Sequence, residues 1–246
     1  MTGRSKLFIG MLAAATLSAV MAPAAAEGPL LQPFAGTGPA PMAPWKVVGL
    51  PQQTKPFTQF TVADVDGKRA LRVEAVESYG NLVHPLQLEM PAAHLAWQWR
   101  LENLIEGADL RTKAGDDTAL KICVFFDLPM DKIPFADRQI LRFARSKTTD
   151  AVPGATVCYV WDAKLAAGTM LDNAFTRRMR YVVVRSGAQR LNQWVAERRD
   201  VAADFAKLFG AESDSVPPII GVAIGADADN TKSRSVGFVT GLTLEP

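Results

Sequence analysis

An alternation of large apolar and polar side chains over residues 94–103 constrains the fold of this chain more than any other feature. One parity carries Leu95, Trp97, Trp99 and Leu101, and the other carries Ala96, Gln98, Arg100 and Glu102. Successive side chains of an extended strand point to opposite faces, so this period of two predicts a β-strand with one buried face. We interpret the two tryptophans as core residues; an aromatic platform that stacks on sugars is the alternative.

The C-terminal segment, residues 219–246, predicts a β-hairpin. An apolar run covers residues 219–224, and the glycine at position 221 argues against a helix there. Alternation over residues 236–244 predicts the return strand. The polar loop 227–231 would join the two strands.

Oxygen-bearing side chains in this loop suggest a cation site. Calcium takes about 6 to 8 oxygen ligands and tolerates irregular geometry. The candidate calcium ligands are Asp116, Asp117, Asp227, Asp229 and Asn230. The alternative is an ordinary turn, in which Asp and Asn side chains accept bonds from their own backbone. The sequence predicts no required cofactor, only this possible structural calcium.

The N-terminal residues predict export. Arg4 and Lys6 precede an apolar segment that ends near Met21, and small residues at 24–26 suit cleavage, so residues 1–26 read as a secretory signal peptide. Residues 27–44 form a lead-in rich in proline and glycine, and residues 45–246 form a single domain. We therefore expect a periplasmic or secreted protein with no transmembrane anchor after cleavage.

Charge and cysteine content limit the functional classes. The chain has 27 basic and 25 acidic residues and a formal net charge of +2. Nucleic-acid binders need a basic footprint, so nucleic acid is not an expected partner. Cys123 and Cys158 lie in strand-like segments, where an exported chain can form a disulfide. Two buried free thiols are the alternative.

The rest of the chain predicts many short strands and two helices. Asp66-Gly67 is typical of a tight hairpin turn between strands near residues 57–64 and 70–77. Helical patterns cover residues 135–147 and 200–209, and Asp200 can cap the start of the second. The predicted fold class is all-β, a jelly-roll-like antiparallel β-sandwich with one or two short helices in crossovers.

Several motifs taken in order resemble a known family of exported bacterial proteins. They are WQWR, GDDTALKICVFFD, CYVWD, YVVVRSG and VAIGADADNT. Together they resemble the family DUF 3047, a domain of unknown function, over about residues 45–244. The matching positions are Trp97, Trp99, Arg100, Asp116, Asp117, Tyr159, Trp161, Ser186, Gly187, Asp227, Asp229, Asn230 and Thr231. The resemblance implies a periplasmic or secreted β-rich domain without an activity to transfer. The family pattern leads us to expect a bulkier aliphatic residue at Cys123, so a disulfide would be particular to this chain.

Three functional hypotheses follow. The first is a non-catalytic binding domain of the cell envelope for a carbohydrate or another polar component, with ligand-binding candidates Arg100, Tyr159, Trp161 and Asp162. For each candidate a structural role is the alternative. The second is a glycan-directed hydrolase with paired carboxylates, although adjacent Asp116 and Asp117 would point to opposite faces of a strand. The third is a structural or interaction protein of the periplasm. Whether the chain is an enzyme stays open, and the sequence favours a protein that is not.

Overall fold

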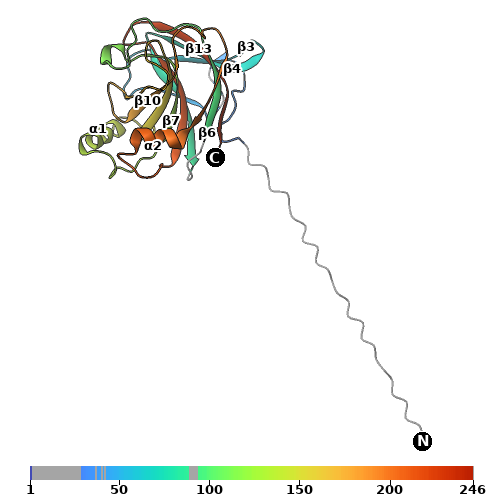
Figure 1. Ribbon diagram of the computed structural model, residues 1–246, viewed down its shortest axis with the longest axis vertical. Helices are drawn as coiled ribbons and strands as arrows, with labels where there is room; N and C mark the ends of the chain where they lie inside the picture. Colours follow the sequence, from blue (N-terminus) through green and yellow to red (C-terminus); the bar gives the residue numbers. More distant parts are fainter. Residues whose placement is uncertain (2–28, 37, 40, 42, 89–93, 246) are drawn as a thin grey trace.

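The computed structural model describes residues 1, 29–36, 38, 39, 41, 43–88 and 94–245, and these form two β-sheets packed face to face (Figure 1). Apart from Met1, the predicted signal peptide (residues 1–26) lies outside the described residues. The six-stranded sheet contains, in spatial order, β1 (Gly38–Pro39), β3 (Gln59–Val65), β4 (Lys68–Val76), β13 (Arg234–Glu245), β6 (His94–Leu101) and β11 (Val195–Asp200). The seven-stranded sheet contains, in spatial order, β2 (Lys46–Val48), β5 (Tyr79–Leu88), β12 (Ile219–Asp227), β7 (Thr118–Phe126), β8 (Ala155–Asp162), β10 (Met179–Ser186) and β9 (Met170–Asp172).

The helices lie in connections between strands, as predicted. Helix α1 (Phe135–Arg145) connects β7 to β8, and α2 (Val201–Phe209) connects β11 to β12. A short 3₁₀ helix, Lys113–Gly115, precedes β7. Asp200 caps α2 by accepting a hydrogen bond from the backbone nitrogen of Ala203 at 2.8 Å, which confirms the predicted start of this helix. Among the residues that the structure describes, no helix is long and apolar enough to cross a membrane.

Strand pairing confirms the sandwich with one departure from the antiparallel pattern. The ladder between β8 and β10 is parallel, and the other ladders between named strands are antiparallel. A parallel pair needs a long connection. Residues 163–178, which carry β9, supply it.

The predicted C-terminal hairpin is wrong, although both of its strands exist. Strand β12 pairs with β5 and β7, whereas β13 pairs with β4 and β6 in the other sheet. The loop between them therefore crosses from one sheet to the other. The local pattern could not distinguish these arrangements because both strands are buried, and buried strands find partners far away in sequence.

The hairpin signal at Asp66-Gly67 is confirmed. Strands β3 and β4 pair up to Val65 and Lys68, and Asp66 and Gly67 between them have φ angles of 52° and 73°. Glycine adopts positive φ without steric cost, and Asp tolerates it better than most residues. This dipeptide therefore sets the register of the edge of the six-stranded sheet.

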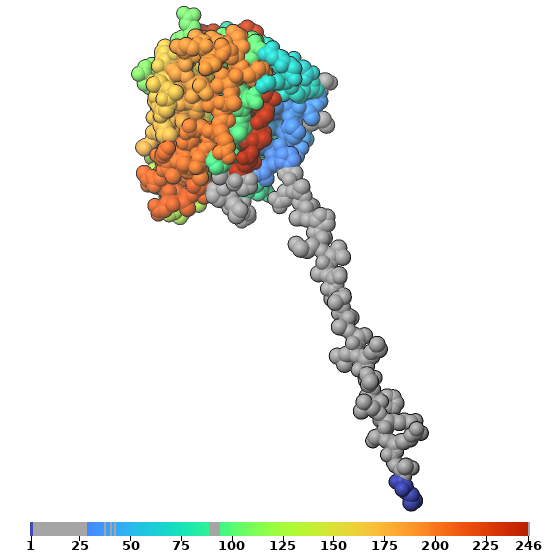
Figure 2. All heavy atoms as spheres, turned by 45° about the vertical axis from the view of Figure 1, so that its right-hand side comes forward, coloured from blue at the N-terminus to red at the C-terminus, as the bar shows by residue number. Residues whose placement is uncertain are grey.

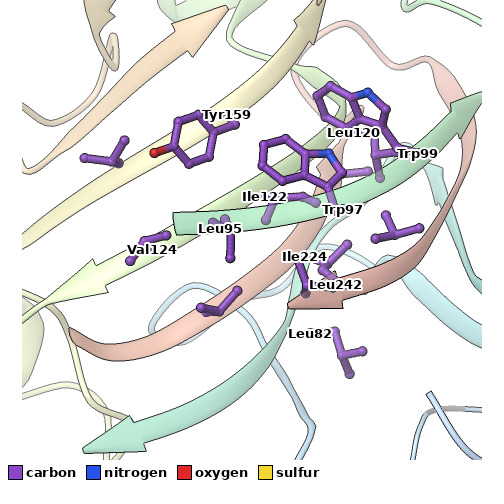
Figure 3. Packing of buried hydrophobic residues seen from close by; sticks show 14 of the residues in the cluster. Leu82, Leu95, Trp97, Trp99, Leu120, Ile122, Val124, Tyr159, Ile224 and Leu242 are labelled. Carbon is purple, nitrogen blue, oxygen red and sulfur yellow. The ribbon is translucent and has the colours of Figure 1, made fainter. Parts of the chain in front are cut away.

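The core between the sheets is built around aromatic side chains (Figure 3). Trp97 and Trp99 on β6 meet Tyr159 and Trp161 on β8, with ring centroids 5.4 Å apart for Trp97–Tyr159 and 5.7 Å apart for Trp99–Trp161. All four side chains are at most 2% exposed. The core interpretation of the alternating segment is therefore confirmed, and β7, apolar on both parities, is the central strand of its sheet.

The lead-in contributes to the core, and the six-stranded sheet forms part of the outer surface. Leu31 and Phe34 of the lead-in are buried in the same core, and the Phe34 ring lies 5.3 Å from that of Trp45. The space-filling view shows the outer surface of the six-stranded sheet, where orange β11, green β6 and red β13 follow one another (Figure 2).

Candidate ligand-binding cleft

A cleft of about 340 Å³ lies on the face of the seven-stranded sheet that points away from the main core. We call it the sheet cleft. Its floor contains Tyr79, Asn81 and Val83 of β5, Cys123 and Phe125 of β7, Thr156 of β8 and Met179 of β10. Its walls come from Ile140, Leu141 and Ala144 of α1, from residues 46–51 and from residues 148–153. Ligand pockets in proteins have volumes of about 300 to 1,000 Å³, so the cleft can hold a small molecule.

The alternation of β7 explains why the sheet presents apolar residues on both faces. Ile122, Val124 and Phe126 belong to the main core, whereas Cys123 and Phe125 belong to a second apolar cluster on the outer face. A strand buried on both sides has no polar parity. The outer apolar cluster therefore needs its own cover, and α1 with its flanking segments supplies part of it.

Two glycines of β12 leave space for neighbouring side chains on the floor of the cleft. A Cβ atom at Gly221 would come within 3.2 Å of the Phe125 ring, and one at Gly225 would come closer still to Asn81 Oδ1. These distances are shorter than ordinary van der Waals contacts, so larger residues would push both neighbours out of place. The small residues predicted here as strand elements thus shape the cleft.

A disulfide crosses the floor of the cleft. Cys123 of β7 and Cys158 of β8 are direct partners in the antiparallel ladder, and their sulfur atoms are bonded. Cys123 lines the cleft and both residues belong to the outer apolar cluster. The bridge ties the two central strands beneath the binding surface.

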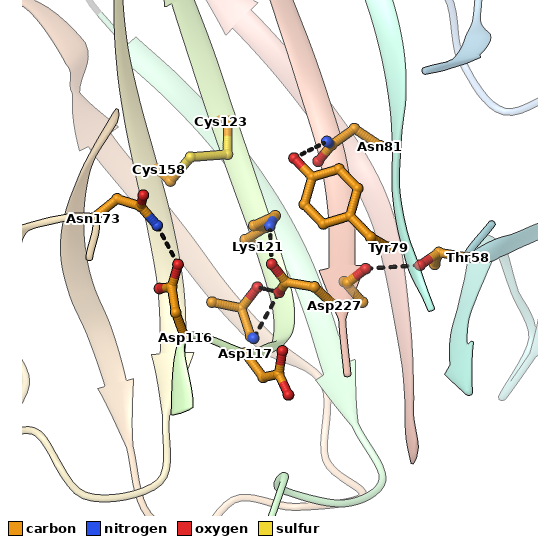
Figure 4. Close-up of polar contacts among 12 residues, drawn as sticks. Thr58, Tyr79, Asn81, Asp116, Asp117, Lys121, Cys123, Cys158, Asn173 and Asp227 are labelled. Atoms are coloured by element: carbon orange, nitrogen blue, oxygen red, sulfur yellow. Dashed lines mark hydrogen bonds and ion pairs between the residues drawn. A yellow bond between two sulfur atoms is a disulfide. The ribbon is translucent and has the colours of Figure 1, made fainter. Parts of the chain in front are cut away.

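Beyond Tyr79 and Asn81, the same sheet face carries a buried polar group around Asp227 (Figure 4). Lys121 Nζ lies 2.8 Å from Asp227 Oδ2, and both side chains are at most 5% exposed. The backbone nitrogen of Thr118 donates to Asp227 Oδ1 at 2.6 Å, and the Thr118 hydroxyl donates to the same atom. Burial is the largest single influence on Lys121 and disfavours its charged form, but the charge and hydrogen bond of Asp227, together with Tyr79 and Asp116, outweigh burial and raise the pKa of Lys121.

Asp116 lies next to this ion pair in a different electrostatic environment. Burial, and after it the charge of Asp227, raises the pKa of Asp116 to about 6. Its carboxylate accepts hydrogen bonds from Asn173 Nδ2 and, at 3.2 Å, from Tyr181 Oη. Burial also raises the pKa of Tyr181, so that hydroxyl remains a donor at neutral pH.

Polar groups in the lining of the cleft offer hydrogen bonds to a ligand. Asn81 Nδ2 donates to the Tyr79 hydroxyl at 3.2 Å, and both side chains are half-buried. Lys46 and Asp150 form an ion pair of 2.7 Å at the rim. Most of the surface between them is apolar. The arrangement suits a ligand with an apolar body and a polar end.

The four ligand-binding candidates from the sequence do not gather at one site. Tyr159 and Trp161 lie in the core between the sheets. Arg100 lies on the six-stranded sheet, where it pairs with Asp66 and its guanidinium is 6.0 Å from the Phe238 ring centroid. Asp162 accepts hydrogen bonds from the backbone nitrogens of Lys164 and Leu165 at 2.7 and 2.5 Å, so it caps the turn after β8. None of the four lines the sheet cleft.

The five calcium candidates divide into separate contacts. Asp117 accepts hydrogen bonds from Asn230 and from both the backbone and the hydroxyl of Thr231, at 2.6–3.2 Å. Asp229 forms an ion pair with Lys55. Asp116 and Asp227 belong to the buried polar group instead. The described residues hold no cluster of three or more His, Cys, Asp or Glu side chains suited to a metal ion. Calcium at this loop stays a prediction.

Apart from Cys123, which was named for a disulfide, the residues of the sheet cleft were not among the sequence candidates. Two signals were present: β7 is apolar on both parities, and residues 135–145 form an amphipathic helix next to it in sequence. Both indicated a second buried surface. The contribution of β5 could not be predicted because β5 reaches the cleft through pairing with β12, far away in the chain.

The fold and cleft define a β-sandwich domain with a candidate binding surface on one sheet. A family model described as "Protein of unknown function (DUF3047)" matches residues 43–243, and the chain belongs to this family. Curated proteins gave no match.

Solved structures give distant likenesses. One is TmCBM61 in complex with β-1,4-galactotriose, with 10% identity over 82% of this chain and 88% of the other, at a TM-score of 0.34. Another is CBM29_1, a family 29 carbohydrate-binding module from Piromyces equi, with 9% identity over 85% and 89% at a TM-score of 0.33. A third is endoglucanase 3 of family GH12 from Trichoderma harzianum, with 10% identity over 84% and 100% at a TM-score of 0.38. Likeness at this level assigns no ligand to this chain.

Proposed function

We propose that this chain is an exported, non-catalytic binding domain of the cell envelope that holds an amphipathic ligand in the sheet cleft. The observation that carries the proposal is the cleft itself: a mostly apolar hollow with a few polar groups in its lining. Apolar surface supplies affinity by leaving water, and a few placed polar groups fix orientation. The ligand class that fits both features is an envelope component with an apolar chain and a hydroxyl-bearing headgroup, such as a carbohydrate.

The apolar part of such a ligand would lie between the sheet and α1. Phe125 and Val83 contribute the floor, and Leu141 and Ala144 contribute the wall. Burying one methylene group contributes about 0.8 kcal/mol. A chain of several methylenes would therefore provide most of the binding free energy.

The headgroup would lie at Tyr79 and Asn81. An asparagine amide and a phenolic hydroxyl both donate and accept hydrogen bonds, which suits sugar hydroxyls. The Tyr79 ring also offers an apolar face to a sugar ring. Burial raises the pKa of Tyr79, so its hydroxyl stays protonated in the physiological range.

Hydrolysis by paired carboxylates receives less support from the geometry. Two carboxylates of a glycosidase face each other across the scissile bond of a bound substrate. Among the aspartates named from the sequence, Asp116 and Asp227 come together in the fold, but both are about 4% exposed and neither lines the sheet cleft. We assign them to the stability of the domain rather than to chemistry.

Calorimetric titration of the mature protein with three probes tests the proposal. The probes are decyl maltoside below its critical micelle concentration, decanoate as the chain alone and maltose as the headgroup alone. We expect decyl maltoside to bind most tightly, decanoate less tightly and maltose least. Ala144→Trp, which fills the cleft from α1, should weaken decyl maltoside at least tenfold.

A matched control lies on the same helix. Ala136 is exposed on α1 and does not line the cleft, so Ala136→Trp should leave binding unchanged. Tyr79→Phe should weaken decyl maltoside more than decanoate. The proposal fails if maltose binds as tightly as decyl maltoside, or if Ala144→Trp and Ala136→Trp behave alike.

Export is part of the same proposal and has its own test. Production of the full chain in a bacterial host, followed by fractionation and mass spectrometry, should give a periplasmic product that begins at Glu27. A product retained in the cytoplasm with its first residues intact would contradict export.

A further inference from the structure

Four large apolar side chains lie exposed around α1. Phe135, Ile140 and Phe143 of the helix are 72%, 65% and 66% exposed, and Phe175 of the segment before β10 is 57% exposed. Ile140 and Phe175 line one shallow hollow beside the helix, so the segment adjoins α1. We call these four residues the α1 patch. Exposed apolar groups gathered in one place mark an interaction surface more often than isolated ones do.

Helix geometry explains the exposure. Phe135 and Phe143 are eight residues apart, and residues at i, i+4 and i+8 share a face. Leu141, by contrast, is buried and lines the sheet cleft. The helix therefore has two apolar sides: one closes the cleft and the other faces solvent.

The charges around the patch are mainly positive. Lys113, Lys132, Arg142 and Lys147 are exposed, and among the described residues no carboxylate pairs with any of them. Lys147 Nζ is 5.1 Å from the Phe143 ring centroid, and Lys113 Nζ is 5.5 Å from that of Phe175.

The acidic residues nearby are largely neutralised. Asp137 lies 3.0 Å from Arg178, and Asp172 pairs with Arg177 and Arg180. Asp131 is the exposed carboxylate beside Lys132. The surface that α1 presents to solvent therefore carries a net positive charge.

We propose that the α1 patch docks on an anionic phospholipid bilayer. Aromatic and aliphatic side chains flanked by lysine and arginine are suited to the bilayer interface, where the rings enter the boundary with the acyl chains and the cations meet anionic headgroups. A protein partner would not require unpaired cations beside exposed rings. The docking rests on the α1 patch alone.

Docking would also explain how an amphiphile reaches the sheet cleft. Ile140 is exposed in the patch and lines the cleft as well. In the docked protein, α1 alone would lie between the bilayer and the sheet cleft. This second step rests on the proposed function, because it needs an amphiphilic ligand in the cleft.

Vesicle sedimentation with the mature protein tests the docking. The vesicles contain either phosphatidylcholine alone or phosphatidylcholine mixed with phosphatidylglycerol. We expect the wild type to bind the anionic vesicles, and to bind the neutral ones at least tenfold more weakly. Phe135→Ser/Phe143→Ser removes two inserted rings and should weaken anionic binding at least tenfold. Arg142→Glu/Lys147→Glu should weaken it about tenfold or more and remove the preference for anionic lipid.

The control variant removes as many exposed apolar side chains elsewhere. Phe57 and Val76 are 50% and 49% exposed and lie outside the α1 patch, so Phe57→Ser/Val76→Ser should bind vesicles like the wild type. Circular dichroism melting of each variant checks that it is folded. Equal binding by all variants, or no binding by the wild type, overturns the proposal. It is also overturned if the patch variant changes only self-association in sedimentation velocity, because the occupant is then a second copy of the chain.

The two proposals fail in different ways. Ala144→Trp should lose decyl maltoside and keep vesicle binding, whereas Phe135→Ser/Phe143→Ser should keep decyl maltoside and lose vesicle binding. If vesicle binding persists while no probe enters the cleft, the docking stands and the proposed function falls.

Discussion

The two faces of the seven-stranded sheet use the same strands for different purposes. On β8, Tyr159 and Trp161 face the other sheet and complete an aromatic core, whereas Cys158 and Val160 face outward into a separate apolar cluster. The inner face is covered by a whole sheet. The outer face is covered by one helix and several loops, and these leave the sheet cleft open.

The difference shows why aromatic content is a poor guide to the binding site here. The largest rings fill the space between two sheets, where only other side chains reach them. Among the described residues, the apolar cluster of the outer face has no tryptophan, and this face carries Phe125, Tyr181, a disulfide and a buried ion pair. A binding surface needs incomplete cover, and that property belongs to the helix and loops above the strand rather than to the strand itself.

The largest expected effect comes from the inner face. Trp97→Ala should lower the free energy of unfolding by about 4 kcal/mol, because it empties a fully enclosed site between the sheets. Urea denaturation measures the loss. Trp97→Phe, which keeps most of the volume, should cost clearly less. A loss below about 1 kcal/mol for Trp97→Ala would mean that this face is packed more loosely than the structure shows.

A substitution on the outer face should destabilise the domain nearly as much, because it leaves a buried charge without its partner. Asp227→Asn leaves the Lys121 ammonium buried without its partner and should cost about 3 kcal/mol. The double variant Lys121→Met/Asp227→Asn removes both charges and should be more stable than Asp227→Asn alone. Denaturation of the three proteins forms the measurement. If the double variant is the least stable of the three, the ion pair stabilises the folded protein by more than it costs to bury its two charges.

The next effect is a pH dependence of stability, and it belongs to Asp116 on the outer face. Folding raises the pKa of Asp116 from 3.8 to about 6, so the folded protein binds this proton more tightly than the unfolded chain does. Stability from this residue is therefore present at low pH and lost as pH rises through about 6, by up to about 3 kcal/mol. Asp116→Asn should remove this part of the pH dependence and leave the protein more stable than the wild type at pH above about 7.

Thermal melting across this range checks the expectation for Asp116. The neighbouring variant Asp117→Asn is the control: it disturbs hydrogen bonds from Thr231 but leaves Asp116 and its pH dependence in place. An unchanged pH profile in Asp116→Asn would show that the carboxyl group titrates in the folded protein as it does in the unfolded chain.

The sequence predicted most elements of the fold because their signals are local. The alternation at Trp97 and Trp99, the turn at Asp66-Gly67 and the cap at Asp200 each depend on a few neighbouring residues, and the structure confirms them. The pairing of β12 and β13 was wrong because sequence neighbours do not have to be sheet neighbours. The choice between sheets depends on long-range contacts that a periodic pattern does not contain.

The candidate site was less predictable than the fold. Tyr79, Phe125 and Ala144 come from two strands and a helix that no motif connects, and they share a cleft only because β12 lies between β5 and β7. The residues that stood out in sequence, Tyr159 and Trp161, did so because they are large, and large residues fill cores. The apolar residues on both parities of β7 and the amphipathic helix that follows it were the local signals for a second buried surface.

The smallest expected effect concerns the loop after β12. The carboxylates in and beside this loop already accept protein donors. Asp117, just before β7, accepts hydrogen bonds from Asn230 and Thr231 of the loop, and Asp229 pairs with the half-exposed Lys55. We therefore expect the melting temperature to stay within about 1 °C when calcium or a chelator is added. Asp229→Ala should cost less than about 1 kcal/mol, because it breaks an ion pair with a largely exposed partner. If calcium raises the melting temperature and Asp229→Ala abolishes the rise, Lys55 must yield its place to the ion. The loop between the sheets would then be stabilised by a ligand, and the contrast between a closed inner face and an open outer face would extend to a third, metal-dependent region.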